Sequence, residues 1–226
     1  MKYFPINLDI VKRKCTVVGG GSVAARKVET LLDCGGKVLV ISPKLTAELS
    51  KLHKAGQIEW WQRQFQPGDL NGSFLVIAAT DDELVQRDVF SEASENDQLI
   101  NVADVPKRCN FILPATVKRD DLTIAISTAG KSPALASKLR QSLEKEIGPE
   151  YSTLTEIMGL LRPEVLKQGR THQENKVVFA SLLHEHFIDW IREGNSNKIK
   201  EHVTSVLGDN ISSECLNTLE KVLSCD

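Results

Sequence analysis

An apolar segment passes through three consecutive glycines into an amphipathic segment within residues 14–27 (KCTVVGGGSVAARK). Gly19 and Gly21 occupy the first two glycine positions of the pattern G-x-G-x-x-G/A, and Ala24 fills the third. The first glycine of this pattern permits a tight turn, and the second lets the backbone approach a pyrophosphate. N–H groups at the start of the following helix would then hold the phosphates. The run therefore predicts a strand, a dinucleotide-binding turn and a helix.

The next hundred residues continue the same alternation of strands and helices. Short apolar runs predict strands at 16–18, 38–41, 58–61, 74–78 and 99–102. Helical patterns follow Ser22, Thr46 and Asp82, and the first of them carries Ala25, Val28 and Leu32 on one face. This alternation is typical of βαβ units around a parallel sheet. We expect an α/β fold whose first part, residues 1–111, is a Rossmann-type domain.

Two further regions follow the predicted Rossmann-type domain. Residues 111–117 and 122–127 read as two strands around the polar turn 118–121, which indicates an antiparallel hairpin. Ser132-Pro133 then provides an N-cap and a proline at the first helical position. Beyond Gly148-Pro149 the pattern is helical throughout. We therefore expect a small α+β region over residues 112–148 and a helical module over residues 149–226.

The overall charge excludes several classes of partner. Lys and Arg total 28 against 30 Asp and Glu, which gives a net charge of -2 and no reason to expect nucleic acid or a membrane surface. The longest strongly apolar run, 74–79, is too short to span a bilayer, and the first residues lack the apolar core of a signal peptide. We expect a cytoplasmic protein.

The cysteines and histidines do not predict a metal site. The five cysteines are scattered and form no C-x-x-C pair, so neither disulfides nor a zinc site is indicated, and Cys15 and Cys34 are predicted to be small core residues. His184 and His186 are predicted to diverge on one helix and so not to share a metal.

The end of the second predicted strand departs from the usual fingerprint. Nicotinamide-binding folds normally carry Asp or Glu there to hold the ribose 2′-OH, but this chain has Ser42, Pro43 and Lys44. Ser42 could bond a ribose hydroxyl, and Lys44 could attract a 2′-phosphate. In the alternative interpretation, Ser42-Pro43 is only a turn and Lys44 a solvated charge. The residues alone leave NAD and NADP open.

Ligand-facing residues are also expected after the fourth and fifth strands. Thr80 and Asp81 follow the fourth strand, and Asp82 is predicted to cap the next helix. Asp104 follows the fifth strand, where it either serves a function or stabilises a turn before Pro106.

A second anion-binding loop is predicted before residue 133. Ala129-Gly130-Lys131-Ser132 fails the P-loop pattern, because Ala125 stands where the first glycine would be, so ATP is not implied. Lys131 at a helix N-terminus would still suit a multiply carboxylated substrate.

Five motifs in order resemble the precorrin-2 dehydrogenase family, which includes the N-terminal part of siroheme synthases. They are residues 17–27 (VVGGGSVAARK), 78–82 (AATDD), 101–104 (NVAD), 111–115 (FILPA) and 126–133 (ISTAGKSP). The resemblance covers residues 5–147 and ends near the point where fused siroheme synthases continue into a methyltransferase domain. Methylation of uroporphyrinogen III is therefore not expected from this chain.

The resemblance implies that precorrin-2 is oxidised to sirohydrochlorin with NAD⁺ as the hydride acceptor, and that some relatives also insert Fe²⁺. The family's cofactor contacts map onto Gly19, Gly21, Ser22 and Val23, onto Pro43-Lys44, and onto Thr80-Asp81. Its active-site aspartate maps onto Asp104, and a residue near substrate maps onto Thr128, beside Lys131 and Ser132. The resemblance also implies a homodimer built on the middle region.

Two other functions are compatible with a nucleotide-binding fold. One is a non-catalytic module that senses NAD(H), and the other is a dedicated chelatase that acts on Fe²⁺ or Co²⁺. A sensor needs neither a proton acceptor at Asp104 nor the 127–132 loop, and the intact glycine turn argues against a chelatase alone. The sequence leaves open which tetrapyrrole pathway the product would enter.

Overall fold

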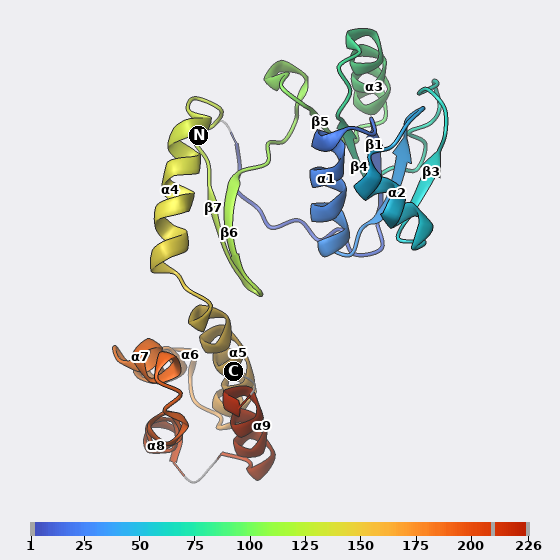
Figure 1. Ribbon diagram of the computed structural model, residues 1–226. Helices are drawn as coiled ribbons and strands as arrows, with labels where there is room; N and C mark the ends of the chain where they lie inside the picture. Colours follow the sequence, from blue (N-terminus) through green and yellow to red (C-terminus); the bar gives the residue numbers. More distant parts are fainter. Residues whose placement is uncertain (1–2, 209–210, 225–226) are drawn as a thin grey trace. The chain divides into compact units, whose positions relative to one another are not determined.

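The computed structural model describes residues 3–208 and 211–224, so Cys225 lies outside the described residues (Figure 1). The chain forms two compact units, one up to Leu113 and one from Pro114 onward. The predicted further division near residue 148 stays a prediction.

A parallel sheet forms the centre of the first unit, as the sequence predicted. Among the described residues, five strands lie in the order β3-β2-β1-β4-β5, and every neighbouring pair is parallel. The strands are β1 (Lys14–Val18), β2 (Lys37–Ile41), β3 (Ile58–Trp61), β4 (Leu75–Ala78) and β5 (Leu99–Val102). β1, β2 and β4 are buried along almost their whole length, which explains why they read as continuous apolar runs.

The helices of this unit cover both faces of the sheet. Helices α1 (Ser22–Asp33) and α2 (Ala47–Lys54) pack in one core with Val17, Val40 and Ile77. Helix α3 (Glu83–Glu95) packs in a second core with Val76 and Ile100. Because successive strand residues point to opposite faces, Val76 and Ile77 contribute to different cores.

The first unit differs from the prediction at Cys34. Cys15 is fully buried as expected, but Cys34 is exposed, so its assignment to the core was wrong. Cys34 is the C-cap of α1, and the buried face of this helix ends with Leu31 rather than with the half-buried Leu32. The helical spacing of Ala25, Val28 and Leu32 predicted the correct buried face but extended it one residue too far.

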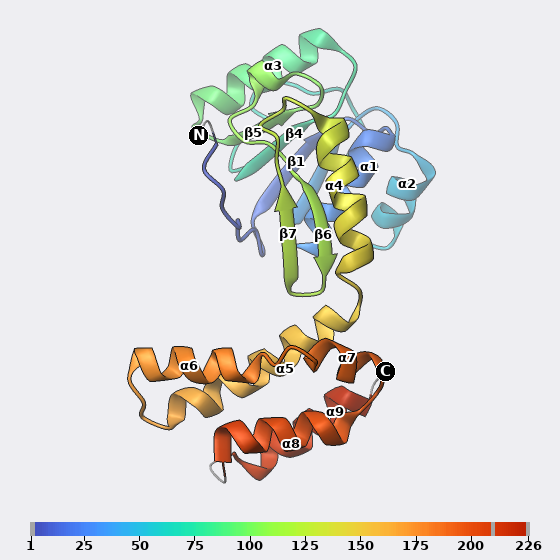
Figure 2. The ribbon, with the colours of Figure 1, turned by 90° about the vertical axis from the view of Figure 1, so that its left-hand side faces the viewer.

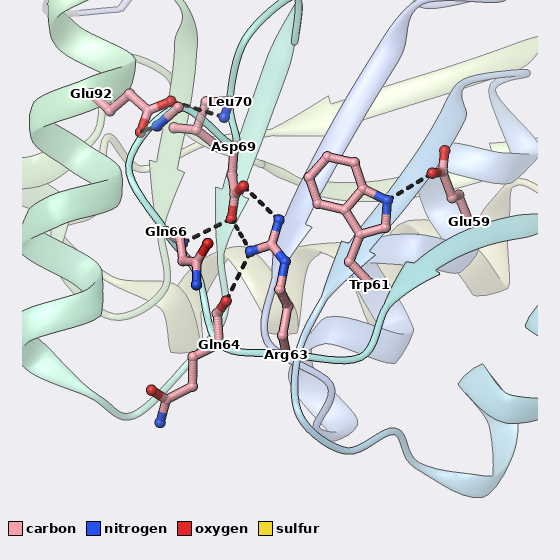
Figure 3. Close-up of polar contacts among 9 residues, drawn as sticks. Glu59, Trp61, Arg63, Gln64, Gln66, Asp69, Leu70 and Glu92 are labelled. Carbon is pink, nitrogen blue, oxygen red and sulfur yellow. Dashed lines mark hydrogen bonds and ion pairs between the residues drawn. The ribbon is translucent and has the colours of Figure 1, made fainter.

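An ion pair organises the connection between β3 and β4, which contains no helix (Figure 3). Arg63 contacts Asp69 through two parallel hydrogen bonds of 2.6 and 2.7 Å, and Asp69 also accepts from the Gln66 backbone N–H at 2.8 Å. Glu92 of α3 accepts the backbone N–H groups of Gly68 and Leu70 at 2.9 and 2.8 Å. These carboxylates replace a helix in satisfying the backbone of the crossover.

An antiparallel hairpin and a helix open the second unit (Figure 2). Strands β6 (Ala115–Arg119) and β7 (Leu122–Ile126) are shorter than predicted, and their turn is Asp120-Asp121 rather than residues 118–121. Helix α4 (Pro133–Glu146) begins as expected, because Ser132 Oγ accepts the Leu135 N–H at 3.2 Å. Arg119 ties the hairpin to the end of α4 by donating to the Ile147 and Glu144 carbonyls at 2.8 and 3.0 Å.

The rest of the second unit is helical, as predicted. Its helices are α5 (Glu150–Lys167), α6 (His172–Leu182), α7 (Phe187–Arg192), α8 (Ser196–Leu207) and α9 (Ser213–Ser224). They share a core that includes Ile157, Leu161, Phe187, Val203 and Leu219.

His184 and His186 lie in the turn between α6 and α7, so the prediction that they share a helix was wrong. Within the described ranges, no helix has the length and apolar character needed to cross a membrane.

Candidate active site

The sheet places its site candidates where the strand order reverses. The chain leaves β1 for α1 on one face and leaves β4 for α3 on the other, so a crevice is expected outside the carboxyl ends of these two neighbouring strands. Gly19 follows β1, Ser42 follows β2, Thr80 follows β4 and Asp104 follows β5. Most of the predicted site residues thus share one edge of one sheet.

The three consecutive glycines meet three different surroundings. Gly19 has φ +124°, and a Cβ on it would lie 2.0 Å from the Ala79 carbonyl oxygen. A Cβ on Gly20 would lie 2.0 Å from the Lys44 carbonyl oxygen, whereas a Cβ on Gly21 would meet nothing within 4 Å. Gly19 and Gly20 are therefore required by the fold, and Gly21 leaves open space above the turn. The sequence pattern had assigned no role to Gly20.

The N-terminus of α1 fits an anionic group. Gly21 is the N-cap, and within the part of the chain that the structure describes, no side chain caps this helix start. Ser22 is exposed and Val23 half-buried, and because they are the first residues of the helix, their backbone N–H groups have no acceptor within it. The first-turn amides of such a helix carry a partial positive charge that suits a phosphate.

The residues after β2 form a turn that packs against the glycines. Ser42 is buried, and its hydroxyl donates to the Lys44 carbonyl at 2.7 Å. The Trp60 indole N–H donates to the Ser42 carbonyl at 2.9 Å, and the Thr46 N–H donates to the Gly20 carbonyl at 3.0 Å. The Ser42 hydroxyl is thus engaged in the turn, while Pro43 and Lys44 are exposed.

Thr80 and Asp82 have different positions in the turn after β4. Asp82 caps α3 by accepting the Leu84 and Val85 N–H groups at 3.0 and 3.2 Å, which confirms its predicted role. Thr80 is half-buried, and its carbonyl accepts from Gln86 Nε2 at 2.6 Å. Asp81 is exposed next to it.

Asp104 lies in a tight turn with an unusual backbone. The Val105 N–H donates to the Val102 carbonyl at 3.2 Å, and Asp104 has φ +59°. Positive φ at the third residue of such a turn is ordinarily taken by glycine, so an exposed aspartate there is a candidate functional residue.

Lys27 shares the electrostatic environment of Asp104. Burial lowers the pKa of the half-buried Lys27 ammonium, the charge of Arg26 lowers this pKa further, and the Asp104 carboxylate partly raises it. The sequence pattern does not reveal this relation because residues 27 and 104 are far apart in the chain.

The second predicted loop belongs to the second unit. The Thr128 hydroxyl accepts the Ser132 N–H at 3.1 Å, and the Thr128 carbonyl accepts the Lys131 N–H at 3.0 Å. Ala129 and Gly130 both have positive φ, and Lys131 is exposed just before α4. The loop thus places the exposed Lys131 next to the N-terminus of α4.

Comparisons with known proteins agree with this arrangement. Residues 6–115 match a family model of NAD(P)-binding domains, and residues 119–146 match the model described as sirohaem biosynthesis protein central. A solved structure described as "SirC, precorrin-2 dehydrogenase" aligns with a TM-score of 0.77 at 25% identity, covering 90% of this chain and 98% of that chain.

Curated relatives carry the same region within longer chains. Siroheme synthase of Photorhabdus laumondii is 36% identical over 92% of this chain and 44% of its own length. Siroheme synthase 1 of Serratia proteamaculans is 41% identical over 87% of this chain and 41% of its own length. The chain therefore spans less than half the length of these relatives.

Proposed function

This chain belongs to the precorrin-2 dehydrogenase family, and from that premise we propose that it oxidises precorrin-2 to sirohydrochlorin with NAD⁺. In this reaction the macrocycle would give up two hydrogens, one as a hydride that NAD⁺ would accept to give NADH and one as a proton. The observation that carries the proposal is the open space above Gly21 at the same sheet edge as Asp104.

The glycine turn and its neighbours would hold the dinucleotide. Gly21, Ser22 and Val23 present backbone at the N-terminus of α1, which suits the pyrophosphate. Pro43-Lys44 and Thr80-Asp81 border the turn on either side. We propose NAD⁺ rather than NADP⁺ on the strength of the family resemblance, because the exposed Lys44 does not by itself exclude a 2′-phosphate. A higher kcat/KM with NADP⁺ would reverse this preference.

Asp104 would accept the proton that leaves the macrocycle. Its carboxylate is exposed at the strand end, so it is accessible to a bound substrate, and a positioned base typically contributes about 10² to 10⁴ in rate. Lys131, with Thr128 and Ser132 shaping its loop, would attract a substrate carboxylate in the second unit.

Anaerobic incubation of precorrin-2 with NAD⁺ tests the function directly. We expect sirohydrochlorin and NADH to appear in equal amounts in the absorbance spectrum. Binding of NAD⁺ without turnover would instead favour the sensing module. Adding Fe²⁺ or Co²⁺ after the oxidation then tests whether the protein also inserts a metal.

We also propose a homodimer built on the middle region. Helix α4 buries only Ala136, while Leu135 and Leu139 are 48% and 43% exposed. An apolar helix face of this kind would lose its solvent contact against a symmetric copy. The cytoplasmic location expected from the sequence stays a prediction.

A further inference from the structure

The Cys109 thiol lies inside the loop that carries Asp104. Its Sγ is 3.3 Å from each of three backbone atoms: the Val102 nitrogen, the Val102 carbonyl oxygen and the Val105 carbonyl oxygen. Asn101 Nδ2 approaches the same sulfur at 3.7 Å. The thiol therefore accepts from the Val102 N–H and donates its single proton to one of the two carbonyls.

These contacts bracket Asp104 on both sides. Val102 and Val105 are the first and last residues of the turn in which Asp104 adopts its positive φ. A backbone in this region persists only when its surroundings hold it, because the conformation is disfavoured for residues other than glycine. Hydrogen bonds from the Cys109 sulfur to both ends of this turn therefore restrain the backbone of Asp104.

The two ends of the loop are fixed by other groups. Asn110 pairs with the edge strand β5, accepting the Ile100 N–H and donating to the Gln98 carbonyl, both at 2.8 Å. Arg108, in the 3₁₀ turn η1 (Pro106–Arg108), lies 3.7 Å from Glu83 of α3. The Arg108 backbone N–H also donates to the Val105 carbonyl at 2.9 Å. Among the described side chains, however, it is Cys109 that hydrogen-bonds the backbone of residues 102 and 105.

We propose that Cys109 is a positioning residue that holds Asp104 in its active geometry. This inference rests on the proposed function, since it assigns Cys109 a role through the proton acceptor. Burial raises the pKa of the Cys109 thiol, while the Val102 backbone opposes the shift, so the group stays a neutral donor near neutral pH.

Replacing the thiol tests the proposal. Cys109→Ala should lower kcat about tenfold, the effect of losing roughly one hydrogen bond that holds the turn, while the KM for NAD⁺ stays unchanged. Cys109→Ser should recover most of the rate, because a hydroxyl can donate and accept at the same place. The exposed Cys34 provides the matched control, and Cys34→Ala should leave both constants unchanged.

A double-mutant cycle separates positioning from general stability. In the Asp104→Asn background, Cys109→Ala should cause no further loss of rate, since the group that the thiol positions no longer acts as a base. An equal tenfold loss in both backgrounds would overturn the proposal, as would a Cys109→Ser enzyme no better than Cys109→Ala.

Hydrogen exchange gives a readout that does not depend on turnover. The amide of Val105 should exchange at least several-fold faster in Cys109→Ala than in the parent protein, while the amide of Ile100, held by Asn110, should not change. An unchanged exchange rate at Val105 would refute the proposal that Cys109 restrains the turn, even if the variant lost activity. A parent protein that fails to oxidise precorrin-2 would refute the proposed function and remove the assigned role of Cys109, whether or not the exchange result confirmed the restraint itself.

Discussion

Single residues at the sheet edge divide into those that the fold needs and those that a ligand needs. At Gly19 the positive φ and the nearby Ala79 carbonyl exclude a side chain. Gly21 has an extended backbone and free space where a Cβ would lie. The same residue type thus serves packing at one position and access at the other. Separate substitutions at the two glycines should therefore affect stability and ligand binding differently.

The glycines give the first prediction. Gly19→Ala should strongly destabilise or prevent folding, because its Cβ would clash with backbone at 2.0 Å. Gly21→Ala should lower the free energy of unfolding by no more than about 1 kcal/mol, the usual range for this change at an N-cap. Gly21→Asp should abolish NAD⁺ binding by placing a charge where the pyrophosphate is expected. Thermal denaturation and titration calorimetry measure both effects, and unchanged affinity in a folded Gly21→Asp protein would contradict the cofactor site.

The second prediction concerns the backbone of Asp104. Asp104→Ala and Asp104→Gly both remove the carboxylate, so each should slow sirohydrochlorin formation by about 10² to 10⁴. The glycine variant should nevertheless be more stable than the alanine variant by about 1 kcal/mol, because glycine adopts φ +59° without the steric cost of a Cβ. Denaturant unfolding compares the two proteins. Equal stabilities would mean that the turn relaxes when the aspartate is lost.

At the scale of elements, polar side chains hold the connections that apolar periodicity does not describe. Burial alone would raise the pKa of the Asp69 carboxyl, but its hydrogen bonds with Arg63 and with the Gln66 N–H lower it overall. A carboxyl whose pKa is lowered on folding stabilises the protein above the unfolded pKa, about 3.9, and loses that contribution as the pH falls through the folded pKa.

The third prediction follows from this ion pair. Asp69→Asn should lower the free energy of unfolding at pH 7 by about 1–3 kcal/mol, the cost of losing charge-assisted hydrogen bonds at a buried site. The difference from the parent protein should shrink below about pH 4, where Asp69 becomes protonated in the unfolded and then in the folded state. Urea unfolding at several pH values measures both. A difference that stays constant with pH would show that packing, and not charge, is responsible.

The predicted and observed elements show what a linear pattern can reveal. The strands of the parallel sheet were predicted because burial on both faces leaves a continuous apolar run, and the caps at Asp82 and Ser132 because a cap is a local contact. The exposure of Cys34 at the end of α1 and the contact between Cys109 and the nearby Asp104 turn depend on how irregular parts of the chain meet their neighbours. Periodicity within one segment contains no record of such meetings.

At the scale of the molecule, the chain is organised as two units with separate cores. The Rossmann-type unit has cores on both faces of its sheet, and the helical part of the second unit has its own. The exposed Leu135 and Leu139 of α4 belong to none of these cores. Self-association is the proposal that accounts for them.

The fourth prediction tests that proposal. Leu139→Asp should convert a dimer to a monomer in light scattering at micromolar concentration, because it places a charge on the apolar face of α4. Lys138→Asp, at an exposed position next to it, serves as the control for charge alone and should leave the dimer intact. A parent protein with a monomeric mass would contradict the dimer directly.

The neighbouring glycines also have a consequence for inheritance. An allele that changes Gly19 or Gly20 would supply no folded chains, so beside a normal copy of the gene it should only reduce the amount of protein. An allele that replaces Gly21 with aspartate would instead supply folded chains that, under the proposed function, do not bind the dinucleotide. If such chains form dimers with normal chains, each mixed dimer contains one defective subunit. The allele should then lower the activity even in a cell that also carries a normal copy.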